Sequence, residues 1–348
     1  MNKFRYIDND ILCKYDLREE FFNKLSFEVN DIIPLRKVFV LLTNEGKKIL
    51  KITDSSEDRV RFIDEALEYT SKEYSNILSY YKDSNENITY KSGENTYVIL
   101  NMLEGREVSY SNPVEIELCT KAIAKLHLAS KGIFNKLDAD MVKGNLGDYL
   151  PYNFSKAKED LINIKDYILR FRYKSDFDNL FLDNIDRNIK SIQKSIELIA
   201  MCNYNDLIGN YSKRVLCHND LAHHNFIVDG EDVKIIDFDY CKIDTRAVDI
   251  ANFAMKVIKN TYYDMDTFKL IIETYNSIDK LSKDEIKLIY AILSFPRDFV
   301  TITRDYYYKQ KKWSYEVFLS RLKDKIINEG YREEFINNFI IELNEYFY

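Results

Sequence analysis

The sequence predicts an α+β fold of two lobes, a small β-rich N-terminal lobe followed by a larger, mainly helical C-terminal lobe. The chain has 348 residues, which is more than one small hydrophobic core usually organises. Strand-like patterns occupy the first third, whereas apolar residues recur at helical spacing over most of the remainder. The change falls near Leu103–Gly105. We therefore expect an N-terminal lobe at residues 1–103 and a C-terminal lobe at residues 104–348.

The N-terminal lobe is expected to combine strands with a single helix. The strands are predicted at Lys24–Ile33, Lys37–Thr43, Lys47–Thr53, Ile88–Tyr90 and Thr96–Met102. The segment "NEG" at 44–46 is the turn between the second and third of them. The helix is predicted over Ser55–Leu78, because Phe62, Ile63, Ala66, Leu67 and Tyr74 recur there at helical spacing.

The C-terminal lobe is expected to be built mainly from long helices. Its first helix should begin after Asn112, a suitable N-cap, with Pro113 at the first helical position and Gly132 just beyond the end. A second strong helix is predicted through the isoleucines from Ile185 to Ile199. After residue 250 the apolar spacing is again mostly helical. Only four prolines and nine glycines occur in the chain, which favours long helices over a turn-rich β sandwich.

Composition excludes several classes of protein. Hydrophobic residues make up 46% and charged residues 31% of the chain, as expected for a folded protein. The net charge of −7 gives no basic field for nucleic acid, although a total charge leaves room for a local basic patch. Residues 1–10 lack the apolar run of a signal peptide, and no stretch reaches the length of a membrane span. Five cysteines without a C-x-x-C pair argue against a disulfide framework or a zinc ribbon and favour a reducing cytoplasm.

The most informative stretch is "CHNDLAHHNFIVDGEDVKIIDFDY" at 217–240. The segment "VLCH" at 215–218 reads as a short strand, and "NFIVDGEDVKIID" at 225–237 reads as a hairpin with an Asp-Gly turn. Asp220 and Asn225 then lie on the loop before the hairpin, and the return strand brings Asp237 beside Asn225. Converging oxygen donors of this kind suit magnesium better than zinc.

These residues carry a family resemblance. H-x-D-x-x-x-x-N, followed by a strand and "IDFD", resembles the catalytic and metal-binding loops of the protein-kinase-like fold. The second acid in "DFD" resembles aminoglycoside and choline phosphotransferases. When the segments "IDFDYCKIDTRAVDIANF" and "LSFPRDFV" are included, the sequence is most similar to the CotS-type spore-coat branch of that family. This resemblance extends from "ILKIT" to the "FP" segment. The resemblance implies a protein-kinase-like fold that uses ATP and Mg²⁺, and it makes spore-coat proteins candidate partners.

The resemblance also implies roles for the residues of this stretch. Asp220 matches the catalytic aspartate, which orients the acceptor hydroxyl and takes its proton. Asn225 and Asp237 match the magnesium ligands that bridge the ATP phosphates. His218 and Asp249 match the two residues that support the loop structurally.

In the N-terminal lobe, the resemblance implies a nucleotide site. Lys51 matches the lysine that neutralises the α and β phosphates, and Glu65 is its expected ion-pair partner, with Glu68 as the alternative. Residues 97–102 are expected to be the hinge strand that faces adenine, which places Leu100 and Met102 at the base.

The sequence departs from the family pattern in its phosphate-binding loop. The corresponding stretch, "EVNDIIPLRKVFV" at 28–40, contains no glycine, although glycine normally lets backbone N–H groups approach phosphate closely. Arg36 or Lys37 is a candidate phosphate contact in its place. Asn219 replaces the glycine or arginine that usually lies between the histidine and the aspartate.

Simpler interpretations compete at the histidines and at Cys217. His218, His223 and His224 with Asp220 could form a zinc cluster, but no fourth ligand at familiar zinc spacing follows. His223 and His224 are better placed at the mouth of the site, where one of them is a candidate contact to acceptor or phosphate. Cys217 ends an apolar strand, so it is expected to be buried and inert rather than nucleophilic. His127 lies between apolar neighbours on a helix and is expected to be an interior histidine.

Two functions remain open and a third is disfavoured. The first is an ATP- and Mg²⁺-dependent kinase for a hydroxyl of a sugar, amino sugar or similar polar metabolite, with Asp239 as a possible substrate contact. An acidic cleft around Asp239 and Asp244 would suit a cationic acceptor. The second is a catalytically weak or inactive scaffold of the spore coat, which the glycine-free loop favours. A protein kinase is disfavoured, because no A-P-E segment follows Asp237.

Overall fold

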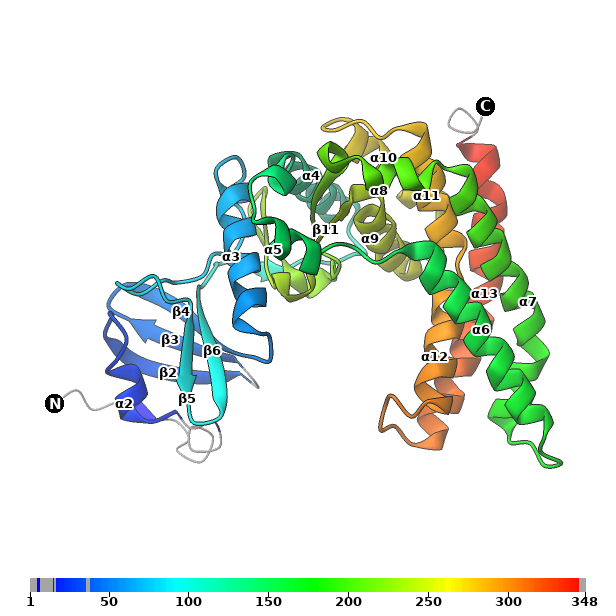
Figure 1. Ribbon diagram of the computed structural model, residues 1–348, viewed down its shortest axis with the longest axis horizontal. Coiled ribbons are helices and arrows are strands. Elements are labelled where there is room, and N and C mark those ends of the chain that lie inside the picture. Colours follow the sequence, from blue (N-terminus) through cyan, green and yellow to red (C-terminus); the bar gives the residue numbers. More distant parts are fainter. Residues whose placement is uncertain (1–4, 7–14, 16, 36–37, 344–348) are drawn as a thin grey trace.

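The computed structural model describes residues 5–6, 15, 17–35 and 38–343. Within them, a β-sheet forms one end of the molecule and a larger helical part forms the other, with α3 (Glu57–Ser71) between the two (Figure 1). The predicted α+β organisation, a small β-rich part followed by a larger helical part, is confirmed. The division into lobes at residues 103 and 104 stays a prediction.

The N-terminal sheet has six strands in the order β1-β2-β3-β4-β6-β5. All neighbouring strands are antiparallel except β1 and β2. The strands are β1 (Arg5–Tyr6), β2 (Val29–Leu35), β3 (Val38–Thr43), β4 (Gly46–Thr53), β5 (Thr89–Ser92) and β6 (Asn95–Asn101). The predicted turn between β3 and β4 is present, and Gly46 has φ +97° there, a value that favours glycine. A short helix, α2 (Glu19–Phe22), packs Phe21 and Phe22 into the same core as Phe39 and Leu50.

Helix α3 is shorter than predicted. It begins after Ser56, whose side chain accepts a hydrogen bond from the Arg59 backbone N–H, and it ends at Ser71. The helical pattern continues in the sequence to Leu78, but that segment pairs with the other part of the molecule. Leu78 N–H donates to the Ile235 carbonyl at 3.1 Å, and Ile77 forms a β-bridge with the same residue. Tertiary pairing therefore overrides the local periodicity.

The helical part contains the two helices predicted most strongly. Helix α4 (Pro113–Ala129) has Pro113 in its first turn, and the Asn112 side chain caps it by accepting from Val114 N–H. Helix α7 (Asp176–Met201) contains the isoleucine stripe and begins with a capping box at Ser175. The remaining helices are α5 (Ala139–Gly144), α6 (Leu150–Leu169), α8 (Tyr204–Gly209), α9 (Arg246–Asn260), α10 (Met265–Asn276), α11 (Lys283–Ser294), α12 (Arg297–Tyr307) and α13 (Tyr315–Glu342). Helices α6, α7, α12 and α13 lie side by side at the far end (Figure 1).

Short strands between the helices position the candidate site. Strands β8 (Arg214–Cys217) and β11 (Lys242–Thr245) form an antiparallel pair. The predicted hairpin is β9 (Phe226–Asp229) and β10 (Asp232–Ile235), with β7 (Arg106–Glu107) on the other side of β9. Gly230 in the turn has φ +64°. Within the described part of the chain, no helix is both long and apolar enough to cross a lipid bilayer.

Candidate active site

The loop after β8 brings Asp220 and Asn225 together. The Asn225 side-chain Nδ2 donates to the Asp220 carbonyl at 2.8 Å and to its carboxylate Oδ2 at 3.3 Å. Asn225 is buried, whereas Asp220 is partly exposed. Because Nδ2 faces Asp220, the amide oxygen of Asn225 is the atom that would be offered to a metal ion.

The hairpin returns to this loop as predicted. Ile236 N–H donates to the Asn225 carbonyl at 3.0 Å, and the His218 ring bonds the Ile236 carbonyl through Nε2 at 2.9 Å. Asp237 follows directly and has φ +66°, an uncommon value for a non-glycine residue. The chain is therefore held to turn sharply at the point where Asp237 projects its carboxylate.

Lys51 of β4 reaches this carboxylate from the N-terminal sheet. Its Nζ lies 2.6 Å from Asp237 Oδ1 and 2.8 Å from Asp239 Oδ2. Burial alone would lower the pKa of Lys51, but the charges of Asp239 and Asp237 outweigh it and raise that pKa above its ordinary value. Two carboxylates thus converge on one cation, and their oxygens together with the Asn225 amide oxygen are the ligand types that Mg²⁺ takes.

The expected partner of Lys51 is different in the structure. Within the described residues, Lys51 forms its ion pairs with Asp237 and Asp239 and none with Glu65 or Glu68. Glu68 instead pairs with Lys82 at 3.0 Å. Glu65 lines a surface hollow between α3 and the segment at Lys136 and Leu137. The expected ion pair between Lys51 and Glu65 is therefore absent among the described residues. The periodicity of an acid-rich helix could not predict it, because it does not tell which acid faces the sheet.

Asp249 lies beneath the loop and binds its backbone. Its two carboxylate oxygens accept hydrogen bonds from His218 N–H at 2.7 Å and Asn219 N–H at 2.8 Å. Burial alone would raise the pKa of Asp249, but the hydrogen bond and charge of His127, with His218, hold it below the ordinary value. The neutral form of His218 is favoured, because complete burial lowers its pKa. Both residues thus sit where a structural support of the loop would have to sit.

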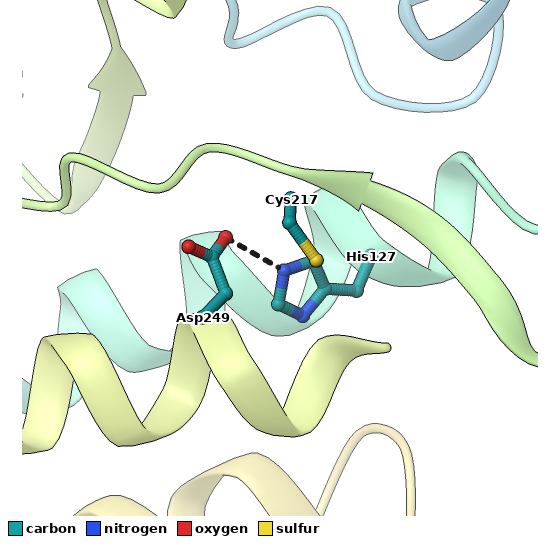
Figure 2. Close-up of side chains that lie close together, drawn as sticks. All are labelled: His127, Cys217 and Asp249. Atoms are coloured by element: carbon teal, nitrogen blue, oxygen red, sulfur yellow. Dashed lines mark hydrogen bonds and ion pairs between the residues drawn. The ribbon is translucent and has the colours of Figure 1, made fainter. Parts of the chain in front are cut away.

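His127, Cys217 and Asp249 form a buried cluster from α4, β8 and α9 (Figure 2). His127 Nε2 lies 3.1 Å from Asp249 Oδ2, and its Nδ1 lies 2.9 Å from the Tyr275 hydroxyl. Burial raises the pKa of the Cys217 thiol well above its ordinary value, so the sulfur stays protonated and is a poor nucleophile and metal ligand. The cluster is a hydrogen-bonded support of the loop, as expected for an interior His127 and an inert Cys217.

Lys256 is a site residue that the sequence analysis missed. Its Nζ lies 2.6 Å from Asp220 Oδ1. Burial alone would raise the pKa of Asp220, but the hydrogen bond and charge of Lys256 lower it. Lys256 follows Asp249 by seven residues on α9, which places both side chains on one face of the helix. The available signal in the sequence was a lysine within an apolar stretch of α9, two turns after Asp249.

Asp220 opens into a hollow of about 820 Å³ in the helical part, a volume within the range of small-molecule sites. We call it the Asp220 hollow. Its lining is Asp148, Leu150, Asn153, Phe154, Lys156, Asn219, Asp220, Tyr240, Lys242, Asp244, Val248, Asn252, Phe295, Arg297 and Arg304. Most of these residues carried no signal of function in the sequence.

Other predicted site residues lie outside this lining. His223 and His224 are exposed on the loop, and His223 faces Glu107 of β7 at 4.0 Å. Asp239 turns its carboxylate to Lys51 rather than into the Asp220 hollow. Hence the structure does not bring these three residues to the cavity beside Asp220.

Only some of the residues expected to contact the nucleotide are described by the structure. Leu100 is buried in β6 opposite Ile49, and Met102 donates its N–H to the Lys47 carbonyl at 3.1 Å. Their role at adenine stays a prediction. The candidate phosphate contacts Arg36 and Lys37 lie outside the described residues.

Comparison with known proteins identifies the family. The family described as "Spore coat putative kinase YutH" matches residues 47–339. This chain belongs to that family. A curated relative, spore coat protein S of Bacillus subtilis (strain 168), is 22% identical over 314 residues, which cover 87% of this chain and 86% of the relative. The match to the family, at residues 47–339, spans Lys51, Asp220, Asn225 and Asp237. The predicted resemblance to spore-coat, kinase-like proteins is confirmed.

Solved structures show that the fold of this family member is kinase-like. An aminoglycoside phosphotransferase from Alicyclobacillus acidocaldarius superimposes with a TM-score of 0.83 at 17% identity, covering 94% of this chain and 96% of the other. A spectinomycin phosphotransferase in complex with ADP and spectinomycin gives 0.60 at 13% identity, covering 84% and 88%. An amicoumacin kinase in complex with AMP-PNP and Ca²⁺ also gives 0.60 at 13%, covering 96% and 94%. At these identities the likeness establishes the fold alone.

Proposed function

We propose that this chain is an ATP- and Mg²⁺-dependent phosphotransferase that phosphorylates a hydroxyl group of a small polar molecule. The observation that carries the proposal is the meeting of Lys51 with Asp237 and Asp239 beside the Asn225–Asp220 contact. Phosphoryl transfer needs a cation, oxygen ligands for a metal and a carboxylate at the acceptor. The Asp220 hollow, next to these groups, has room for such an acceptor.

Each group has a distinct part in the proposed reaction. Asp220 accepts the proton of the acceptor hydroxyl, whose oxygen forms a bond to the γ-phosphorus while the bond from that phosphorus to ADP breaks. Asn225 and Asp237 would hold Mg²⁺, which neutralises phosphate charge when it is bound. Lys51 is released from Asp237 and Asp239 to pair with the phosphates. Proteins of related fold whose structures were solved with ADP, or with AMP-PNP and Ca²⁺, support the use of a nucleotide and a divalent ion.

Titration calorimetry of the purified chain with Mg·ATP tests the first step. Saturable binding is expected, and the absence of heat over a broad range of concentration would speak strongly against the proposal. The second step is ATP consumption with a panel of hydroxyl compounds. Asp220→Asn should lower kcat by about 10²–10⁴-fold and leave the affinity for Mg·ATP within about threefold of the wild type. Asp229→Asn, at an exposed carboxylate in the β9–β10 hairpin, is the matched control.

A second candidate is a non-catalytic scaffold of the spore coat. The glycine-free stretch at 28–40 favours it, as does the pairing of Lys51 with the residues that would bind metal. The relative named spore coat protein S supports a place for this chain at the spore coat. Turnover that depends on Asp220 would exclude the scaffold, whereas equal, trace ATP consumption by wild type and Asp220→Asn would favour it.

A further inference from the structure

The acidic residues of the Asp220 hollow are largely neutralised by their surroundings. Asp148 pairs with Lys242 at 2.5 Å, and Asp220 pairs with Lys256 at 2.6 Å. Asp244 is buried and accepts from Thr245 N–H at 2.7 Å. Burial raises its pKa to about 7, so much of its charge is absent at neutral pH. The acidic cleft expected from the sequence therefore offers little free negative charge.

The basic residues of the hollow divide into paired and unpaired cations. Lys156 lies 3.2 Å from Glu159, and Arg304 lies 2.5 Å from Asp160. Arg297 is different, because no carboxylate of the described chain lies within ion-pair distance of its guanidinium. Its neighbour in sequence, Asp298, is held by Lys259 at 2.8 Å and by Lys325 at 3.4 Å.

Arg297 is fixed in place but keeps most of its donors. Its Nη1 donates to Asn252 Oδ1 at 2.7 Å, which orients the planar fork and leaves other N–H groups for a ligand. The side chain is exposed, and it lines the Asp220 hollow. It also stands at the first residue of α12, where the helix dipole adds positive potential.

The support of Arg297 comes from the same helix as the support of Asp220. Val248, Asn252 and Lys256 follow one another at four-residue spacing on α9, so their side chains share one face. Asn252 holds Arg297 and Lys256 holds Asp220. One helix face therefore sets the guanidinium and the carboxylate on the wall of a single cavity.

We propose that the acceptor carries an anionic group, a carboxylate or a phosphate, which Arg297 binds while a hydroxyl of the same molecule reaches Asp220. This inference rests on the proposed phosphotransferase function. A guanidinium fork matches both anions in charge and geometry. The stacked rings of Phe154 and Phe295, 4.1 Å apart, and the exposed ring of Tyr240 give the cavity an apolar wall for the carbon skeleton. The acceptor class is thus a sugar acid or a phosphorylated polyol rather than an amino sugar.

Inorganic phosphate is the probe for this site. The full-length chain is saturated with Mg·AMP-PNP, so that the nucleotide site is closed to the probe, and phosphate is titrated at constant ionic strength by calorimetry. Arg297→Ala should weaken phosphate binding by about tenfold or more, because a charge-assisted hydrogen bond is lost. Arg297→Lys should weaken it less. Lys156→Ala, which removes a paired cation of the same hollow, should change it by less than about threefold.

Two results of the phosphate titration would overturn the inference. One is no measurable binding of phosphate to the wild type at about 20 mM or below, well above the millimolar range typical of weak sites. The other is equal binding to the wild type and to Arg297→Ala, with both proteins shown to be folded by their thermal unfolding. If the wild type does not bind Mg·AMP-PNP, the proposed function fails, but the comparison of the two proteins without nucleotide still decides the role of Arg297.

The second part of the experiment compares acceptors that share one sugar ring and differ in charge. Phosphoryl transfer from Mg·ATP is measured with glucuronate, glucose 6-phosphate, glucose and glucosamine at equal concentration. Higher kcat/KM for the two anionic compounds, lost in Arg297→Ala, is the expected result. A preference for glucosamine would refute an anionic acceptor while supporting a phosphotransferase. If none of the four is phosphorylated, the phosphate titration alone decides.

Discussion

The carboxylate of Asp220 has its cation from an unexpected source, Lys256, a residue 36 positions later in the chain. In the proposed reaction Asp220 must be ionised to accept a proton from the acceptor. Burial opposes ionisation, and Lys256 restores it. Lys256 is therefore a positioning residue that acts through Asp220, and its contribution should be visible in the pH dependence of the reaction.

Lys256→Met should move the acidic limb of the pH profile of kcat/KM to higher pH. Without the ammonium group, burial dominates and the pKa of Asp220 rises, so the carboxylate is protonated over more of the acidic range. Within the acidic limb we expect kcat/KM to fall by about tenfold, which corresponds to about 1.4 kcal/mol. Lys269→Met, which removes an exposed lysine paired with Glu342, should leave the profile unchanged. An unshifted limb in Lys256→Met would contradict this role.

Asp244 should make the stability of the protein fall as the pH rises. Its pKa is about 7 in the folded chain and near the ordinary 3.8 in the unfolded chain, so the folded state binds the proton more tightly. The stabilisation is complete below about pH 4, decreases by about 1.4 kcal/mol per pH unit above it and is lost once the pH has passed about 7.

Urea unfolding of the wild type and of Asp244→Asn at pH 5, 6, 7 and 8 checks this expectation. The difference in free energy of unfolding between the two proteins should shrink from pH 5 to pH 7 and then level off. Other titrating groups, such as His218, cancel in this difference. A pH-independent difference would mean that Asp244 is charged in the fold.

At this scale the sequence predicted which residues lie close together where they belong to one short motif. Asp220, Asn225, Asp237 and their support Asp249 lie within 30 residues of one another, and local spacing placed them close together. The partner of Lys51 and the cation at Asp220 depend on which side of a distant helix faces the site. No local pattern encodes that choice, so Lys256 was missed.

At the scale of elements, hydrogen bonds of Arg59 connect α3 to the helical part. Its Nη2 donates to the carbonyls of Asp239 at 2.7 Å and Cys241 at 2.6 Å, and its Nη1 donates to Asn145 Oδ1 at 2.5 Å. These bonds hold the segment that follows Asp237 against α3. In this structure the link between α3 and the proposed metal-binding segment is thus an arginine bonded to main-chain carbonyls.

Arg59→Ala should loosen α3 and weaken nucleotide binding together. Loss of hydrogen bonds from a charged group to partly buried acceptors should reduce the free energy of unfolding by about 2–3 kcal/mol. Amide hydrogen exchange in α3 should rise, and the Kd for Mg·ATP should increase several-fold. Arg61→Ala on the same helix is the control, because Arg61 is exposed and pairs only with Asp58 at 3.3 Å among the described residues. Unchanged exchange in α3 would show that other contacts hold it.

The elements themselves were largely predictable because their signals are local. The cap at Asn112, the Asp-Gly turn and the isoleucine stripe of α7 all correspond to observed boundaries or interiors. The end of α3 was not predictable in the same way. Its helical pattern runs on into a segment that pairs with Ile235, and such a long-range pairing leaves no mark in the local sequence.

At the scale of the whole molecule, Lys51 joins the N-terminal sheet to the helical part through Asp237 and Asp239. A metal ion at Asp237 must compete with this ammonium group, whereas a nucleotide would draw the ammonium group away to its phosphates. The two ligands should therefore bind cooperatively. A nucleotide that draws the ammonium group away frees Asp237 for the metal ion, and a metal ion at Asp237 frees the ammonium group for the phosphates. The general two-part architecture was readable from the sequence, but this competition depends on distances that only the folded chain defines.

Lys51→Met should affect the metal ion and the nucleotide in opposite directions. With the ammonium group absent, Asp237 and Asp239 repel one another, so free Mg²⁺ should bind several-fold more tightly than to the wild type. Binding of ATP in the presence of Mg²⁺ should weaken by about 10–100-fold, because a charge-assisted contact to phosphate is lost. Calorimetric titrations with Mg²⁺ alone and with Mg·ATP measure both effects. Lys47→Met on the same strand, where Lys47 is exposed and pairs with Glu104, should alter neither. Weaker binding of both ligands to Lys51→Met would mean that Lys51 holds the two parts together rather than competing with a metal ion for Asp237.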